Sequence, residues 1–183
     1  MHYPKKRNIH RLPHIYLDNT QYFITARTYK EFNYFHSDKK REILSECIKN
    51  AFDECNENLL AWVVLRNHYH LNCRIKNKDN LKKITKLING KSSFLVNSLD
   101  DKRGRKVWHQ YHDTILESEK DFWTRFNYIH CNPIKHDYVR SLDQLESYKF
   151  SSYNYYLKKY GKEWILSVFE EYSVIDFTKT PPD

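Results

Sequence analysis

Two histidines separated by one residue are the side chains with the clearest chemical potential in this sequence. Residues 68–75 read His-Tyr-His-Leu-Asn-Cys-Arg-Ile. The two-residue period of a strand places His68, His70, Asn72 and Arg74 on one face and mostly apolar side chains on the other. Two imidazoles one pleat repeat apart can bind one divalent metal ion together. A solvated sheet face gives the same pattern, so the pair needs support from elsewhere in the chain.

A second candidate group lies on a helix predicted from Ser118 to Asn132. The apolar stripe of this helix consists of Phe122, Phe126 and Ile129. Tyr128 lies about 120° from the centre of that stripe, so packing does not require it there. Asn132 is one turn further on and offers an amide oxygen to a metal ion. A boundary aromatic and a helix-ending asparagine explain the same spacing, because Pro133 disfavours continuation of the helix.

The order of predicted elements indicates how these groups are positioned. Hydrophobic periodicity predicts strands at residues 22–27, 59–65, 68–75 and 107–116, and helices at residues 38–55 and about 81–95. Gly90 favours an interruption of the second helix. We therefore predict an α+β fold of the ferredoxin-like or RRM-like split βαβ type, with an antiparallel sheet and both helices on one face. The other face is then open to a ligand, and the helix from Ser118 is an addition.

Composition narrows the functional classes. The chain has 183 residues, 31 Lys and Arg against 23 Asp and Glu, a net charge of +8, and 16% aromatic residues. Such a basic, aromatic-rich chain is a candidate for binding single-stranded nucleic acid. It contains no apolar stretch of about 18 residues and no signal peptide, so we expect a cytoplasmic protein without a membrane role. Its four separated cysteines indicate reduced thiols.

Charge and periodicity also suggest three regions. Residues 1–17 form a basic N-terminal arm, residues 18–140 a catalytic or binding domain, and residues 141–183 a C-terminal extension that is partly helical. Residues 76–106 carry ten basic and three acidic side chains, a local excess of 10 − 3 = +7. The rings of Tyr69, Trp108 and Tyr111 are candidates for stacking on bases, although each is also a candidate for the core.

Four segments in order resemble one family. Asn67–Leu71 is similar to the HUH motif of single-tyrosine transposases, and Tyr128–Lys135 (Tyr-Ile-His-Cys-Asn-Pro-Ile-Lys) resembles the nucleophile segment of their REP-associated, IS200-like branch. Trp108–Asp113 and Phe150–Tyr153 resemble that branch's Trp-Gln strand and its aromatic-Ser-Ser segment. The sequence departs from the family pattern at Arg66, where proline is common, and at residues 136–138, where small residues are common.

The resemblance implies metal-dependent cleavage and rejoining of single-stranded DNA. His68, His70 and Asn132 correspond to the ligands of Mg²⁺ or Mn²⁺, and Tyr128 corresponds to the nucleophile that forms a 5′-phosphotyrosine. The implied substrate is single-stranded DNA with hairpins like repetitive extragenic palindromes. The sequence identifies no general base for Tyr128, and it leaves open whether a monomer or a homodimer forms the site.

If the chain cleaves single-stranded DNA, its basic residues are candidate DNA contacts. They are Lys5, Lys6, Arg7, Arg11, Arg74, Lys82, Lys83, Lys86, Lys91, Arg103, Arg105, Lys106 and Arg125. One alternative is a noncatalytic, domesticated protein that binds single-stranded nucleic acid on the same fold. A second is a zinc hydrolase with His109 and His112 as further ligands, but the sequence lacks a His-Glu-x-x-His or similar spacing.

Overall fold

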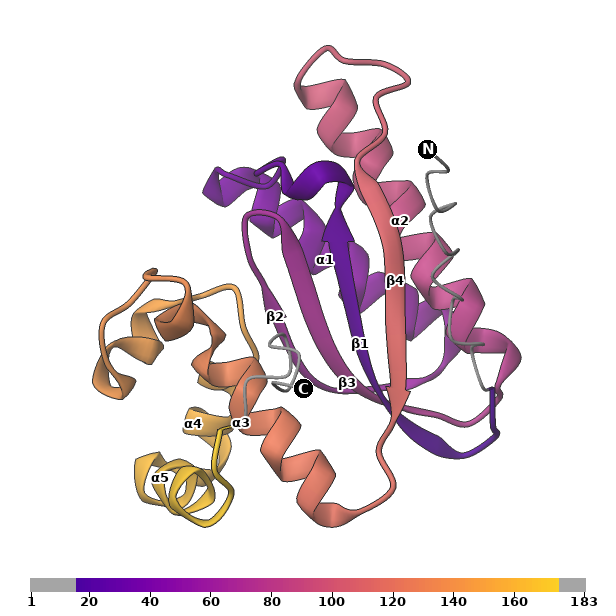
Figure 1. The fold of residues 1–183 in the computed structure, drawn as a ribbon. Helices are drawn as coiled ribbons and strands as arrows, with labels where there is room; N and C mark the ends of the chain where they lie inside the picture. Colours follow the sequence, from indigo (N-terminus) through magenta and orange to yellow (C-terminus); the bar gives the residue numbers. More distant parts are fainter. Residues whose placement is uncertain (1–15, 175–183) are drawn as a thin grey trace, which may run out of the picture.

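A four-stranded antiparallel sheet forms the centre of the molecule. The computed structural model describes residues 16–174, so the predicted contacts Lys5, Lys6, Arg7 and Arg11 lie outside the described residues. The strands are β1 (Thr20–Thr28), β2 (Asn58–Val64), β3 (His68–Ile75) and β4 (Trp108–Ile115), in the order β2-β3-β1-β4 (Figure 1). This is the order of the split βαβ fold. The prediction of an α+β, ferredoxin-like fold is confirmed.

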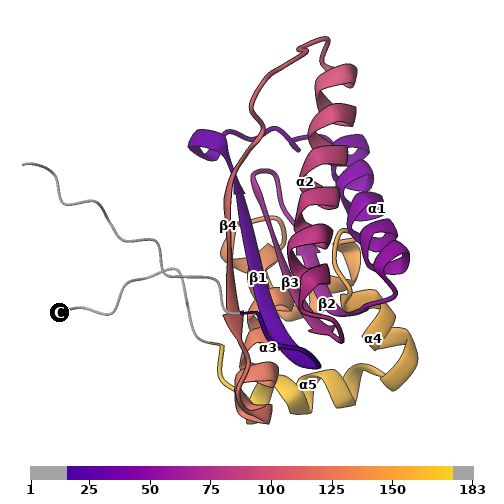
Figure 2. The same ribbon diagram turned by 90° about the vertical axis from the view of Figure 1, so that its right-hand side faces the viewer.

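Two long helices cover one face of this sheet. They are α1 (Asp38–Cys55) and α2 (Asp79–Leu99), which pack side by side behind the strands (Figure 2). The apolar face of β3 lies beneath them and is fully buried. Gly90 does not interrupt α2, contrary to expectation. The buried side chains of Ile84, Ile88 and Val96 continue the packed stripe on both sides of Gly90, and this packing outweighs a propensity cost of about 1 kcal/mol.

The rings proposed for base stacking face these helices instead. Tyr69 is fully buried, and Trp108 is 7% exposed and donates its indole N–H to Ser92 Oγ at 2.9 Å. The half-buried Tyr111 shares a hydrogen bond with the Tyr16 hydroxyl at 3.2 Å. Of the two alternatives for these rings, the core is therefore confirmed for Tyr69 and Trp108, which lie between sheet and helices.

Helix α3 (Glu119–Lys135) packs on the opposite face of the sheet, against β2 and β3. It continues through Pro133 to Lys135 rather than ending near Asn132 as predicted. A proline lacks the N–H for its own helical bond and crowds the carbonyl four residues before it, but an amide after Pro133 keeps a helical acceptor: His136 N donates to Asn132 O at 3.1 Å. The extra residues keep Lys135 on the same helix as Tyr128.

The segment after α3 covers the β2 edge and supports α3. It contains η2 (Leu142–Ser147), α4 (Tyr153–Tyr160) and α5 (Lys162–Glu171). Before α4 the backbone bonds along β2, with Val64 N donating to Phe150 O and Ser152 N to Trp62 O, both at 2.9 Å. This covers an otherwise open sheet edge. Among residues 16–174, no helix combines the length and hydrophobicity of a membrane span.

One buried amide joins α5 to α3. Asn127 Nδ2 donates to Val168 O at 2.8 Å and to Tyr172 O at 2.5 Å. We predict that Asn127→Ala lowers the free energy of unfolding by about 1–3 kcal/mol, because two carbonyls lose a donor in a largely buried place. Urea denaturation followed by circular dichroism measures this. The control is Asn154→Ala, whose bond to Glu146 O is exposed. Equal losses of unfolding free energy in Asn127→Ala and Asn154→Ala would show that the Asn127 hydrogen bonds make no special contribution to stability.

Candidate functional site

The histidine face of β3 lies against α3 and is not solvated. His68 is 8% exposed, His70 1% and Asn72 0%. The His70 ring lies 5.2 Å from the Tyr128 ring, edge to face, and stacks on Phe23 at 5.4 Å. Tyr128 itself is 2% exposed. The fold thus brings the predicted histidines and the predicted tyrosine together within one chain.

Hydrogen bonds fix the orientation of both imidazoles. His70 Nδ1 shares a bond with Thr25 Oγ1, and His68 Nδ1 shares one with Asn67 Oδ1, each at 2.7 Å. Burial is the main cause that lowers the pKa of His68 to about 3 and that of His70 well below its usual value. Both rings are therefore neutral at pH 7, which is the form that binds metal ions. His70 Nε2 is buried and bonds to no other described residue.

Asn132 supplies an oxygen beside the imidazoles. Its Nδ2 donates to Tyr128 O at 2.8 Å, which fixes the amide. The Asn132 side chain opposes the fall in the pKa of His68, so the amide lies next to that ring. Its Oδ1 is buried and forms no hydrogen bond of ordinary geometry with another described residue. Buried polar atoms without partners are rare and often mark an absent ion or water.

These atoms fit a divalent cation. The donor set is two neutral imidazole nitrogens and one amide oxygen, which is typical of zinc and other transition-metal ions and less typical of Mg²⁺. Within residues 16–174, no three His, Cys, Asp or Glu side chains converge on one point. Asn132 stays the predicted third protein ligand of such an ion. The same finding leaves the exposed His109 and His112 on β4 without the further ligands that a zinc hydrolase site requires.

Two cations flank Tyr128. Lys135 Nζ donates to Tyr128 Oη at 3.4 Å and lies 5.2 Å from the centre of its ring. Arg125, one turn before Tyr128, places its guanidinium 4.6 Å from the Phe23 ring centre. Burial lowers the pKa of Arg125 to about 10, so it remains charged at neutral pH.

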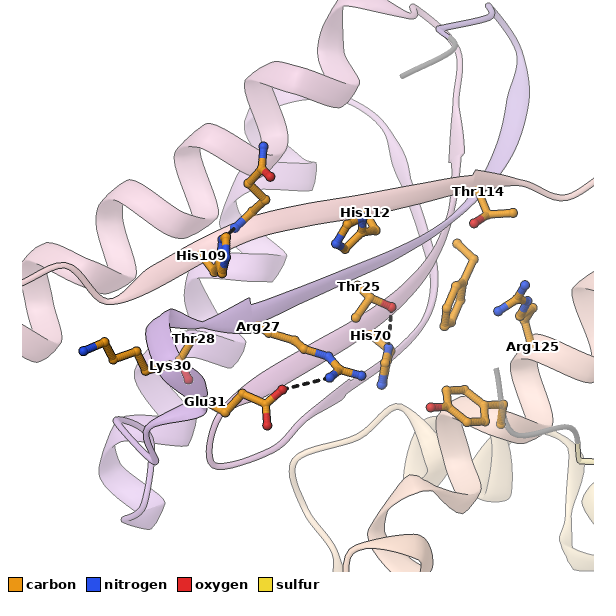
Figure 3. Close-up of a pocket in the computed structure, with 13 residues that line it drawn as sticks. Thr25, Arg27, Thr28, Lys30, Glu31, His70, His109, His112, Thr114 and Arg125 are labelled. Carbon is orange, nitrogen blue, oxygen red and sulfur yellow. Dashed lines mark hydrogen bonds and ion pairs between the residues drawn. The ribbon is translucent and has the colours of Figure 1, made fainter. Parts of the chain in front are cut away.

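Tyr128 and His70 open onto a cavity of about 510 Å³ between α3 and the sheet (Figure 3). Its floor is the polar face of β1 and β4, including Thr25, His112 and Thr114. At one end it reaches Lys30, Glu31 and His109, and near α3 it reaches Arg125. A smaller cavity of about 190 Å³ adjoins the site on the His68 side and also contains Lys135, His136 and Arg27.

The predicted DNA contacts do not all lie near this cavity. Arg125 lines it, and Arg74 lies in a separate hollow beside Phe122 and Trp123. On the exposed surface of α2, across the sheet from α3, are Lys82, Lys83, Lys86 and Lys91. The loop between α2 and β4 contains Arg103, Arg105 and Lys106. Contact of these residues with DNA stays a prediction.

Two cations at the site were not assigned roles from the sequence. Lys135 belongs to the motif that resembles the family, but the predicted end of the helix excluded it. Arg27 follows Phe23 and Thr25 at two-residue spacing on β1 and lines both cavities. The alternation along β1 could have pointed to Arg27 as a site residue. That inference needs the pairing of β1 with β3, which the sequence does not give.

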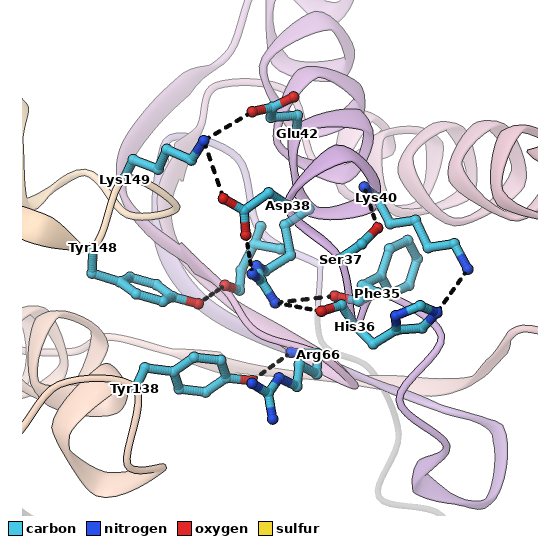
Figure 4. A network of polar contacts seen from close by, with 12 residues as sticks. Phe35, His36, Ser37, Asp38, Lys40, Glu42, Arg66, Tyr138, Tyr148 and Lys149 are labelled. Carbon is cyan, nitrogen blue, oxygen red and sulfur yellow. Dashed lines mark hydrogen bonds and ion pairs between the residues drawn. The ribbon is translucent and has the colours of Figure 1, made fainter.

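Two departures from the family pattern contact one another. Arg66 N–H donates to the Tyr138 hydroxyl at 2.9 Å, and the Arg66 guanidinium lies 5.0 Å from the Tyr138 ring centre (Figure 4). A proline at position 66 lacks this N–H. The contact ties the turn before β3 to the chain just after α3. A third departure, His136, places its ring 4.8 Å from that of His68.

The ferredoxin-like sheet thus places its His-x-His pair against a tyrosine on an added helix. The sequence model described as "Transposase IS200 like" matches residues 16–132. The chain therefore belongs to the IS200-like transposase family, which confirms the resemblance found in the sequence. No curated protein matches this chain.

One similar solved structure supports the fold, and two others are less similar. A REP-associated tyrosine transposase bound to a REP hairpin is similar with a TM-score of 0.65 and 17% identity, covering 82% of this chain and 87% of that chain. A putative transposase from Deinococcus radiodurans has a TM-score of 0.43 and 16% identity, covering 70% and 94%. The tRNA(His) guanylyltransferase from Saccharomyces cerevisiae has a TM-score of 0.44 and 12% identity, covering 94% and 85%.

Proposed function

We propose that this protein cleaves and rejoins hairpin-bearing single-stranded DNA through a covalent 5′-phosphotyrosine on Tyr128. The observation that carries the proposal is the contact between Tyr128 and His70, whose rings lie 5.2 Å apart beside one cavity. Membership of the IS200-like family supports the reaction class. The hairpin in the proposal comes from the similar REP-associated transposase, which is bound to a REP hairpin.

His68, His70 and Asn132 are the residues that would hold Mg²⁺ or Mn²⁺. Such an ion, when bound, polarises the scissile phosphate and stabilises charge on its oxygens. The surrounding residues keep these side chains ready to bind the ion. Burial keeps both imidazoles unprotonated, while Thr25 and Asn67 hold the ring nitrogens that do not face the ion.

The covalent step exchanges one ester for another. Tyr128 Oη forms a bond to phosphorus as the bond from phosphorus to the 3′ oxygen breaks, so the 5′ phosphate remains on the tyrosine. The 3′ oxygen takes up a proton and leaves as a hydroxyl, and the phenol loses one. Because the number of phosphoester bonds is unchanged, the reverse attack rejoins DNA without an external energy source.

Lys135 is the side chain that we assign to activation of the Tyr128 phenol. Its ammonium donates to Tyr128 Oη and so stabilises the phenolate, both as the attacking group and as the leaving group in rejoining. Arg125 and Arg27 border the same cavity and attract the phosphates on either side of the cleaved bond.

One chain contains every proposed site residue. Tyr128 lies on the same side of the sheet as His68 and His70, and α3 is packed against its own β2 and β3. A partner's helix is therefore not needed to complete the site, and we propose that Tyr128 acts with the histidines of its own chain.

Tyr128→Phe should abolish a covalent protein–DNA adduct. The test incubates the protein with Mn²⁺ and labelled hairpin-bearing single strands from its genomic neighbourhood, followed by a denaturing gel. His70→Ala should lower the adduct at least about 100-fold, because changes even outside the ligand set of metal sites cost about 10–100-fold. Tyr155→Phe, an exposed tyrosine on α4, is the control. An adduct in Tyr128→Phe would refute the nucleophile, and binding without an adduct would favour the noncatalytic alternative.

Lys135→Met should slow adduct formation roughly 10- to 100-fold, the kinetic equivalent of one charge-assisted hydrogen bond of about 1.5–3 kcal/mol. Single-turnover rates measure the effect. Lys135→Arg should retain more of the rate than Lys135→Met, because it keeps the charge. Lys39→Met, at an exposed position of α1, provides the control for loss of charge. Equal rates for wild type and Lys135→Met would remove Lys135 from the mechanism.

Mn²⁺ should raise the melting temperature of the protein, because only the folded state brings the three ligands together. At a concentration 100 times its dissociation constant, the ion adds about 2.7 kcal/mol of stability. Scanning fluorimetry should show that this stabilisation disappears in His70→Ala and persists in His109→Ala, an exposed histidine of the same cavity. Full stabilisation of His70→Ala would place the ion elsewhere.

A further inference from the structure

An aromatic and basic surface lies at the end of the sheet where β1 finishes and β4 begins. It is built around η1 (Tyr29–Glu31) and the chain that follows, close to the loop from α2 (Figure 1). We define the η1 surface as the side chains of Tyr29, Lys30, Phe32, Tyr34 and Lys106. None of them is among the residues proposed for metal binding or cleavage, although Lys30 also lines the cavity of Tyr128.

The rings of this surface are accessible. Phe32 is 52% exposed, although a phenylalanine is normally buried. It contacts Tyr34 edge to face at 5.8 Å, and Tyr29 is half-buried. Arg105 lies 4.5 Å from the Tyr34 ring centre, but its charge is already paired with Asp100 at 2.7 Å. Arg105 therefore supports the Tyr34 ring, while Phe32 is left for an external contact.

Two lysines of the surface retain uncompensated charge. Lys106 Nζ lies 4.6 Å and Lys30 Nζ 5.6 Å from the centre of the Tyr29 ring. Neither forms an ion pair with any residue in the described range 16–174. A cation at an exposed aromatic ring is held weakly, so a phosphate can recruit both ammonium groups.

The backbone presents these side chains in an unusual conformation. Lys30 and Glu31 have φ values of 54° and 56°, in the left-handed region that residues other than glycine seldom adopt. The conformation is held by Tyr29 N, which donates to Val107 O at 2.8 Å, and by Thr28 Oγ1, which donates to Phe32 O at 2.7 Å. Strained backbone held in this way is concentrated at functional sites.

The η1 surface is continuous with the cavity of Tyr128. Lys30 and the neighbouring His109 line that cavity at the end away from Arg125 (Figure 3). The His109 ring lies 6.5 Å from the Tyr29 ring, on the surface side. A strand that places a phosphate at Tyr128 and follows the polar floor of β1 and β4 therefore reaches the η1 surface.

We infer that the η1 surface binds unpaired nucleotides on one side of the scissile phosphate, an inference that rests on the proposed function. Lys30 and Lys106 contact backbone phosphates, and Phe32 stacks on a base. Exposed rings beside lysines are the features that hold single strands with little sequence preference. Continuity with the cleavage cavity favours this occupant over an acidic protein.

The test measures binding by fluorescence anisotropy in a Tyr128→Phe background, which prevents cleavage. The probes are labelled hairpins with single-stranded extensions of about 12 or about 3 nucleotides on the 5′ or the 3′ side. The hairpin whose long extension lies on the side of the η1 surface, either 5′ or 3′, should bind to Phe32→Ala about tenfold more weakly. The affinity for hairpins with short extensions should be unchanged. Lys106→Ser should reduce the slope of log affinity against log salt by about 0.7 on that long-extension hairpin.

Matched controls are Phe94→Ala, a 69% exposed phenylalanine on α2, and Lys39→Ser on α1. Losses of equal size on long and short hairpins, or losses no larger than those of the controls, would overturn the inference. If the background protein binds no hairpin at all, the proposed function fails together with it. If hairpins bind and the wild type forms an adduct while Phe32→Ala and Lys106→Ser behave as wild type, only the η1 surface is refuted.

Discussion

The packing of α3 on the open face of the sheet is the interaction on which the site depends. It buries His70, Asn72 and Tyr128 almost completely. The same burial keeps the imidazoles neutral and holds the phenol against them, so one packing contact sets both chemistry and geometry. Without this packing, the imidazoles would be solvated and their pKa values would return toward the usual range, and Tyr128 would lose its contact with His70.

Several polar contacts beyond the apolar stripe hold α3. Asn72 Nδ2 donates to Phe122 O at 3.3 Å from the sheet, and Asn127 joins α3 to α5. His130 shares a 2.8 Å bond with Ser152, which also bonds the β2 backbone. The family match ends at residue 132, but Ser152 and α5 lie after it. The C-terminal extension therefore helps to hold α3, the helix that carries Tyr128, on the sheet.

Local sequence patterns predicted the helices and strands well, but they did not predict which elements pack on the faces of the sheet. The period of two correctly sorted the faces of β3, and the apolar spacing gave both ends of α1. Alternation does not reveal whether a polar face meets water or another element, so the burial of His68 and His70 could not be predicted from it. The rule that proline ends a helix failed at Pro133 because the amides after it keep acceptors within the helix.

The density of basic residues along the sequence did not predict which cations surround the site. The strongest basic run, residues 76–106, includes the lysines of α2, which lie across the sheet from Tyr128. The cations around the cavities instead come one at a time from distant positions: Arg27 from β1, Arg125 from the first half of α3 and Lys135 from its last residue. Their convergence is a property of the fold. It surrounds two neutral imidazoles with positive charge, which favours an anion such as a phosphate in a cavity where the Tyr128 hydroxyl already accepts a hydrogen bond from an ammonium group.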